Sequence, residues 1–408
     1  MFPRLKRTCK LLKYFIFAKY TWDWPRQSDV LIFDACHQEL LLRFFDPCIP
    51  EILHVRGEQI NMRVLMSSIF SRGSKTEAYV DCFIRKVCPR LVVTYIDNNI
   101  NFLTISKRHP NVKTLFIQNG LRSYHEDLFA PLDEIDSSLL SHLKVDYMLT
   151  FGSLIGEEYS RYIAGTVVPI GSMKNNFVRK MPAKQKGVIG YISTWQKVSA
   201  RLCGKHYTEH TYITPVDRII ISNLLCYSKA KNKRLMIISK NPKNGKSRKQ
   251  EEEHFRKLLN QEPEFFDQPE PYPSYQSVDL ADVVVGTEST LSYESIARGN
   301  KTAIFSIRAE LLGIPGLNYG WPGDFPDAGL FWTNNTCSKS FNRILDYLFE
   351  IDDIQWEKDV KATNFSSLMV YDTGNSKLKE ILIKELGLPP ETKNIATSVQ
   401  RESVDADT

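Results

Sequence analysis

The stretch that decides the fold is ADVVVGTESTLSYESIARGNKTAIFSI, residues 281–307. It opens with an apolar run, continues with the polar segment GTEST, and ends in a second apolar run behind Gly299. A continuous apolar run is typical of a strand buried on both faces, and the helix formers between the two runs indicate a helix. The stretch therefore predicts a strand–helix–strand unit, in which Gly286 permits a tight exit and Ser289 or Thr290 caps the helix.

Short apolar runs of the same kind recur along the chain and alternate with helical or polar segments. A polar linker at 181–187, MPAKQKG, separates two series of them. This alternation predicts an α/β protein with two Rossmann-like, doubly wound domains that face a cleft. The expected strands are 29–34, 51–55, 90–96, 113–118, 145–151 and 167–170 in the first series, and 188–193, 235–239, 282–285, 302–307 and 330–333 in the second.

Length and composition agree with two folded domains. The chain has 408 residues, of which 42% are hydrophobic and 25% charged, as in ordinary globular proteins. The net charge of +6 fits an anionic ligand or an anionic membrane surface and is too small to indicate nucleic acid. Eight scattered cysteines without a CxxC pair indicate reduced thiols in a cytoplasmic protein.

Four regions are expected along the chain. Residues 1–27 form a basic amphipathic segment, 28–180 an N-terminal Rossmann-like domain, 187–375 a C-terminal one, and 392–408 a polar, disordered tail. The first segment can pack on the domain as a helix with a solvated basic face, or lie on an anionic bilayer, and both alternatives stay open. No uncharged apolar run is long enough for a spanning helix, so contact with the inner face of the membrane would be peripheral.

The polar segment GTEST suits a ligand at the end of a parallel strand. The first amides of a helix have no internal partner and favour an anion, so Gly286, Thr287, Ser289 and Thr290 can seat a phosphate. A carboxylate repels phosphate, and Glu288 is therefore expected to accept hydrogen bonds from sugar hydroxyls. Simple helix capping is the alternative for the whole segment.

Other expected strands also end in polar residues. Because the carboxyl ends of parallel strands meet at one edge of a sheet, these residues are expected to face a ligand together. A segment at 171–176, GSMKNN, belongs to the same set. The remaining members are Asp97, Asn98, Asn99, Gln118, Asn119, Gly120 and Arg122 on the first domain, and Ser193, Lys240 and Arg308 on the second.

Four motifs, ADVVVGTESTLSYESIARG, TYIDNNINF, LFIQNGLR and PIGSMKNNF, resemble a family of bacterial surface-carbohydrate biosynthesis transferases, itself similar to glycosyltransferases of the GT-B fold. The resemblance covers about residues 28–375. It implies a nucleotide-activated sugar, CMP-linked by preference, in the C-terminal domain, and a glycan or lipid-linked glycan acceptor in the N-terminal domain. It implies further that Ser289 and Thr290 hold the donor phosphate, with Ser193, Lys240 and Arg308 as neighbours.

An inverting transferase of this kind needs a general base for the acceptor hydroxyl. Asp97, directly behind a strand, is preferred, and His125 and Glu288 are the alternatives. No metal and no cofactor beyond the nucleotide-sugar co-substrate are expected. The aromatic segment WPGDFPDAGLFW, 321–332, can stack on a sugar or base or can cover the sheet edge.

Three rival functions remain open on the same scaffold. A CDP-polyol phosphotransferase of teichoic-acid type would leave a phosphate in its product. A nucleotide-sugar epimerase would act without an acceptor. A non-catalytic partner would bind a nucleotide sugar without turnover.

Overall fold

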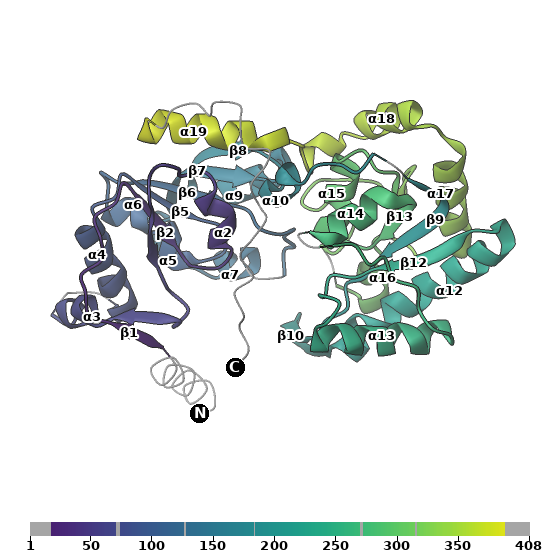
Figure 1. The fold of residues 1–408 in the computed structure, drawn as a ribbon, viewed down its shortest axis with the longest axis horizontal. Helices are drawn as coiled ribbons and strands as arrows, with labels where there is room; N and C mark the ends of the chain where they lie inside the picture. The colour runs from purple at the N-terminus through teal and green to yellow at the C-terminus, as the bar shows by residue number, and fades with distance from the viewer. Residues whose placement is uncertain are drawn as a thin grey trace.

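The computed structural model describes residues 18–70, 74–125, 128–182, 184–269, 272–314 and 316–387. It contains two parallel β-sheets covered by helices, one in each half of the chain (Figure 1). The predicted α/β class with two Rossmann-like domains is confirmed. The sequence interpretations of the first 17 residues and of the tail 392–408 lie outside the described residues.

The N-terminal sheet has six parallel strands in the order β3-β2-β5-β6-β7-β8. Their apolar runs are continuous because helices cover both faces of the sheet; all four residues of β2 and of β5, for example, are buried. The strands are β2 (Val30–Phe33), β3 (Glu51–Leu53), β5 (Leu91–Thr94), β6 (Lys113–Ile117), β7 (Lys144–Thr150) and β8 (Ala164–Pro169). The helices of this half are α2 (Gln38–Leu42), α3 (Met62–Ser68), α4 (Lys75–Val87), α5 (Ile100–Leu103), α6 (Ile105–Arg108), α7 (Phe129–Asp133), α8 (Ser137–Leu140) and α9 (Ser153–Ser160).

The C-terminal sheet has five parallel strands in the order β12-β9-β13-β14-β15. They are β9 (Gln185–Ile192), β12 (Arg234–Ile238), β13 (Ala281–Gly286), β14 (Thr302–Phe305) and β15 (Trp332–Thr333). The helices are α11 (Glu209–Tyr212), α12 (Thr214–Lys231), α13 (Lys246–Leu259), α14 (Pro273–Leu280), α15 (Thr290–Ala297), α16 (Arg308–Leu312), α17 (Ser338–Glu350) and α18 (Asp353–Ala362), followed by the 3-10 turns η1 (Phe365–Ser367) and η2 (Thr373–Asn375).

Two small sheets were not anticipated from the sequence. β1 (Lys19–Thr21) pairs in parallel with β4 (Gln59–Asn61) at the outer end of the N-terminal half, and β10 (Ser199–Leu202) forms an antiparallel hairpin with β11 (Lys205–Thr208). All four strands are short and largely polar, so they lack the apolar runs that reveal the strands of the main sheets.

The last helix, α19 (Ser376–Leu386), returns from the C-terminal half to the N-terminal sheet (Figure 1). Its buried residues Leu378, Ile381 and Leu382 join a core cluster with residues of β2 and β5. The guanidinium of Arg90 donates to the carbonyls of Leu386 at 3.0 Å and Glu385 at 2.6 Å, which satisfies the end of the helix.

The segment 171–176, expected to face a ligand, instead joins the two halves through α10 (Met173–Phe177). The carbonyl and the side-chain oxygen of Asn175 both accept hydrogen bonds from Arg298, at 3.2 Å each. Arg298 in turn pairs with Asp279, and both of these side chains are fully buried. The expectation fails because the polar groups of this segment form hydrogen bonds with other parts of the chain. Those partners cannot be read from the sequence.

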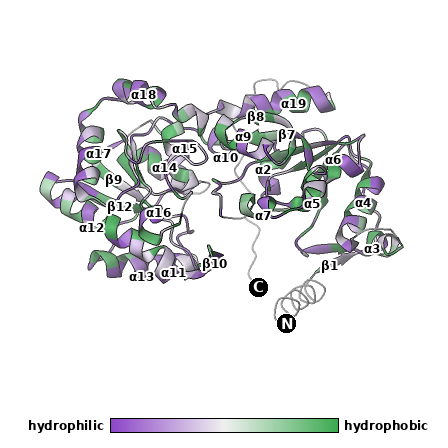
Figure 2. Ribbon diagram, turned by 180° about the vertical axis from the view of Figure 1, so that it is seen from behind, coloured by the Kyte–Doolittle hydropathy of each residue, from purple (hydrophilic) through white to green (hydrophobic). Residues whose placement is uncertain are grey.

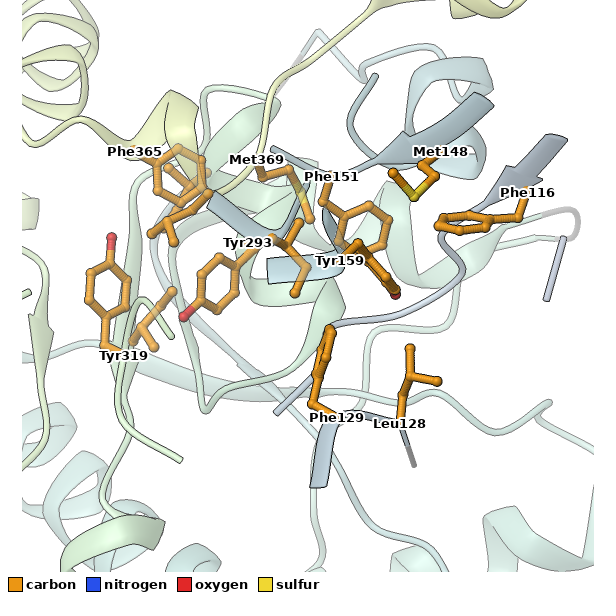
Figure 3. Packing of buried hydrophobic residues seen from close by; sticks show 14 of the residues in the cluster. Phe116, Leu128, Phe129, Met148, Phe151, Tyr159, Tyr293, Tyr319, Phe365 and Met369 are labelled. Atoms are coloured by element: carbon orange, nitrogen blue, oxygen red, sulfur yellow. The ribbon is translucent and has the colours of Figure 1, made fainter. Parts of the chain in front are cut away.

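One hydrophobic cluster runs through both halves. It includes Phe116 and Phe151 from the N-terminal half, and Tyr293, Phe365 and Met369 from the C-terminal half (Figure 3). In Figure 2 the outer helices carry both hydrophilic and hydrophobic stretches, as helices that cover a sheet do. No helix in the described part of the chain has the length and apolarity needed to cross a membrane.

Candidate functional site

A pocket lies where loops from the two halves meet. Its N-terminal wall is the loop behind β6, and its C-terminal wall is formed by residues behind β13 and β14 together with the segment before the aromatic stretch. The halves also touch directly here, because the backbone N–H of Leu121 donates to the hydroxyl of Thr290 at 3.0 Å. The lining residues are Leu121, Arg122, Ser123, Tyr212, Glu288, Tyr293, Arg308, Gly316, Leu317, Asn318 and Trp321.

Glu288 and Arg308 form an ion pair in this pocket, with only 13% and 6% of their side chains exposed. The second carboxylate oxygen of Glu288 accepts a hydrogen bond from Ser306 at 3.4 Å. The guanidinium of Arg308 also lies over the ring of Tyr212, 4.6 Å from its centroid, which suits a cation–π contact. The carboxylate of Glu288, which was expected to bind sugar hydroxyls, is thus paired mainly with Arg308.

Three buried polar atoms of the pocket lack a hydrogen-bond partner within the described chain. They are the Nε of Arg308, the hydroxyl of Ser123 and the carboxylate oxygen of Glu288 that is ion-paired with Arg308. A buried polar group without a partner costs free energy, so such groups indicate a place for a ligand or water. A guanidinium and a hydroxyl that line one pocket suit an anion such as phosphate.

Asp97, the preferred base, lies behind this pocket and is fully buried. Its carboxylate accepts a hydrogen bond from the Nε of Arg122 at 2.9 Å and a further bond from the hydroxyl of Tyr159. Burial opposes the charge on Arg122, but the adjacent Asp97 outweighs this effect and raises the pKa of Arg122. This burial and these bonds argue against Asp97 as the base, because its oxygens hold Arg122 and Tyr159, and its assignment as the base stays a prediction.

The other expected acceptor-side residues divide between the pocket and the interior. Gln118 is buried and links the carbonyl of Gly120 to the backbone N–H of Phe151, at 2.9 and 2.8 Å. Asn119 accepts a hydrogen bond from Arg122 at 2.9 Å. Of the loop residues 118–122, Arg122 lines the pocket, whereas Gln118, Asn119 and Gly120 support the loop.

Asn98 and Asn99 line a second hollow, formed with Asp34, Val55 and Arg56 at the ends of β2 and β3. Here Arg56 donates to the buried carboxylate of Asp34 at 2.7 Å. The expectation that every polar strand end faces one cleft is therefore wrong: the N-terminal strand ends serve two separate hollows.

The expected phosphate seat is occupied by the protein itself. Ser289 caps α15, since its hydroxyl accepts from the N–H of Ser292 at 3.3 Å, and Thr290 accepts from Leu121 as described above. A Cβ on Gly286 would lie 2.1 Å from the Ser292 hydroxyl, so glycine is required by the close approach of α15 to β13. Thr287 is fully buried and its hydroxyl finds no partner in the described residues.

Ser193 and Lys240 do not line the pocket. The buried hydroxyl of Ser193 accepts from the N–H of Trp195 at 3.2 Å, and the ammonium of Lys240 donates to Gln196 at 2.6 Å. Desolvation lowers the pKa of Lys240. Both residues are used in the turns behind β9 and β12.

His125 lies two residues beyond Ser123, with its ring edge-on to that of Tyr124 at 4.9 Å. It is partly exposed and stays outside the pocket lining. Its role as a base stays a prediction.

The aromatic segment divides between the edge of the sheet and the pocket, and stacking on a sugar or base stays a prediction. Trp332 is buried in β15 and stacks on Tyr319 at 4.5 Å, whereas Trp321 lines the pocket and packs 5.3 Å from the ring of Phe129. No group of His, Cys, Asp or Glu side chains in the described ranges is arranged to hold a metal ion.

Sequence reasoning missed Ser123, Tyr212, Asn318 and Trp321 as individual pocket residues. Ser123 directly follows Arg122 at the polar end of the strand 113–118, so its place in the sequence is the signal that could have identified it. Tyr212 comes from α11, behind the unanticipated hairpin, and no strand end signals its position.

The two facing Rossmann-like domains and the pocket between their strand ends define a protein of the GT-B type. Within that class, the chain belongs to the family described as "putative O-antigen biosynthesis protein", whose model matches residues 115–386. A comparison with curated proteins finds no relative.

Solved structures of similar architecture include a glycosyltransferase from Rickettsia africae ESF-5 (11% identity, 88% of this chain and 99% of that one, TM-score 0.49). The UDP-GlcNAc 2-epimerase of Methanocaldococcus jannaschii (9%, 87% and 99%, 0.48) and the wall teichoic acid polymerase TagF (10%, 89% and 89%, 0.47) are similar to a comparable degree. Likenesses of this size decide neither fold nor reaction, and the fold assignment rests on the two parallel sheets themselves.

Proposed function

We propose that this chain is a glycosyltransferase that moves a sugar from a nucleotide-activated donor to a glycan or lipid-linked glycan acceptor during synthesis of a surface polysaccharide. The observation that carries the proposal is the buried guanidinium of Arg308 in the pocket between the domains, with an Nε that lacks a partner in the described residues. Membership of an O-antigen biosynthesis family supports a carbohydrate product.

In this proposal the donor phosphate binds Arg308 and Ser123, and Trp321 lies against the sugar or the base. Charge-assisted hydrogen bonds to a guanidinium stabilise the leaving phosphate without a metal ion. Glu288, whose carboxylate is paired with Arg308 in the same pocket, and His125 are the two further candidates for the base that activates the acceptor hydroxyl. A CMP-linked sugar is the preferred donor.

Nucleotide binding tests the pocket directly. Calorimetric titration with CMP, CDP, UDP and GDP should find one nucleotide preferred, and Arg308→Gln should weaken its binding about 10–100-fold, since a hydrogen bond to a charged group contributes about 1.5–3 kcal/mol. Arg218→Gln is the matched control, because Arg218 is exposed on α12 outside the pocket. Equal affinity in both folded variants would remove Arg308 from the site.

Mass spectrometry of the product then separates the rival functions. Sugar transfer adds the mass of a glycosyl residue to the acceptor, whereas a polyol phosphotransferase adds a phosphate as well. Conversion of the donor without an acceptor would identify an epimerase. Binding without turnover would identify a non-catalytic partner.

A further inference from the structure

Exposed hydrophobic side chains gather at the outer end of the N-terminal half. On α3 and directly behind it, Met66 is 45%, Ile69 55% and Phe70 92% exposed. On and behind β1, Trp22 is 57% exposed and Trp24 42%. Large apolar side chains that reach water in one place mark an interaction surface.

These residues belong to one continuous surface. β1 pairs with β4 residue by residue, and α3 begins directly after β4, with Asn61 as its cap. The side-chain amide of Asn61 donates to the carbonyl of Asp23 at 2.7 Å, which ties the segment behind β1 to the start of α3. Both Figure 1 and Figure 2 place β1 and α3 side by side, far from α19.

Cations accompany the aromatic rings on this surface. The ammonium of Lys86 lies 4.3 Å from the ring centroid of Trp24, and the guanidinium of Arg63 lies 5.9 Å from it. Two carboxylates, those of Asp23 and Glu58, are also nearby in the chain. Tryptophan and tyrosine favour the boundary between lipid and water, and lysine and arginine favour anionic headgroups.

The chain that leads into β1 has the same character. Residues 1–17 contain no Asp or Glu and include the cations Arg4, Lys6, Arg7, Lys10 and Lys13. This basic stretch directly precedes β1, which begins at Lys19, in the sequence. Charge complementarity therefore favours an anionic partner over a second copy of a chain that is itself basic.

We propose that α3, β1 and the tryptophans behind β1 form a docking surface for an anionic lipid bilayer. Met66, Ile69 and Phe70 enter the boundary between headgroups and acyl chains, and Arg63 and Lys86 contact the lipid phosphates. The loop 54–58 between β3 and β4 links this surface to the hollow lined by Asp34, Val55 and Arg56. A bilayer bound here lies beside the strand ends of the N-terminal domain.

Vesicle co-sedimentation of the full chain tests the proposal without reference to activity. We expect binding to phosphatidylcholine vesicles that contain phosphatidylglycerol, weaker binding without it, and weaker binding as salt is added, because salt screens the charges. Met66→Ser with Phe70→Ser should lower the affinity about a hundredfold or more, which is the loss expected when two apolar side chains no longer enter the bilayer. Arg63→Gln with Lys86→Gln should lower it by about fivefold for each cation, for anionic vesicles only.

Ile354→Ser is the matched control, since Ile354 is 81% exposed on α18 in the other half of the molecule. It should bind vesicles as the unaltered chain does, and equal melting temperatures would show that the variants are folded. Undiminished vesicle binding by the Met66/Phe70 variant overturns the proposal. So does light scattering that shows a dimer of the unaltered chain, lost in that variant, together with no vesicle binding.

Discussion

The surroundings of Asp97 in the folded chain differ from those that its place in the sequence predicts. Its position behind an apolar strand predicts a catalytic carboxylate, yet in the structure it is fully buried against Arg122 and Tyr159. Its contribution to the pocket is indirect, because it orients the guanidinium of Arg122, which lines the pocket. At the residue scale, Asp97 is thus a positioning group.

Replacement of Asp97 by Asn should reduce stability more than chemistry. It leaves Arg122 charged in a buried site, and removal of one partner of a buried pair costs about 3–5 kcal/mol. Urea denaturation of Asp97→Asn beside Asp324→Asn, an exposed control, measures this loss. A variant of unaltered stability whose turnover falls by about 10²–10⁴ would instead restore Asp97 as the general base.

At the scale of elements, α19 packs against the N-terminal sheet although it follows the C-terminal half in the chain. Its apolar face covers the N-terminal sheet, the ammonium of Lys377 donates to the carbonyl of Pro169 at 2.7 Å, and the hydroxyl of Tyr147 donates to Glu385 at 2.5 Å. A helix from residues 376–386 thus completes a domain whose sheet ends more than two hundred residues earlier. Sequence order alone would assign it to the C-terminal domain.

Leu382 and Ile383 are adjacent on α19 but differ in burial, so replacing each by Ala tests the packing of this helix. Leu382→Ala should lower the free energy of unfolding by about 2–5 kcal/mol, because Leu382 is buried against the sheet. Ile383→Ala should change it by less than about 0.5 kcal/mol, since Ile383 is 36% exposed on the same helix. Equal losses in urea denaturation would contradict the packing of α19 described above.

At the scale of the whole molecule, the two halves share interior as well as a pocket. The cluster with Phe151, Tyr293 and Met369 crosses between them, and the buried pair of Arg298 with Asp279 holds the junction through Asn175. Such contacts couple the folding of one half to that of the other. The pocket therefore has walls whose spacing is held by packed contacts.

Differential scanning calorimetry should accordingly find a single cooperative transition, with equal calorimetric and van't Hoff enthalpies, despite the two sheets. The preferred nucleotide should move this one transition upward, since a ligand at 100 times its Kd stabilises by about 2.7 kcal/mol. Two resolved transitions, of which the nucleotide shifts one, would show that the halves unfold independently.

The strands of the main sheets could be predicted because burial on both faces leaves a continuous apolar run. The run at 29–34 contains β2 (Val30–Phe33), and that at 90–96 contains β5 (Leu91–Thr94). β1 and β10 could not be predicted, since short polar strands at the surface carry no such pattern. Glu288 and Arg308 were identified as site residues but not as a pair, although they follow neighbouring strands whose register matches Gly286 with Ile304.

The sequence by itself determined which segments become strands and helices, and that polar residues follow the strands, because apolar periodicity and turn chemistry act over a few neighbouring residues. Only the tertiary structure decided the use of those polar residues. Asp97, Gln118 and Asn175 hold loops and domains together through hydrogen bonds, whereas the Nε of Arg308 has no hydrogen-bond partner in the described residues. Burial and hydrogen-bond partners come from residues far apart in the chain, so they exist only once the chain has folded.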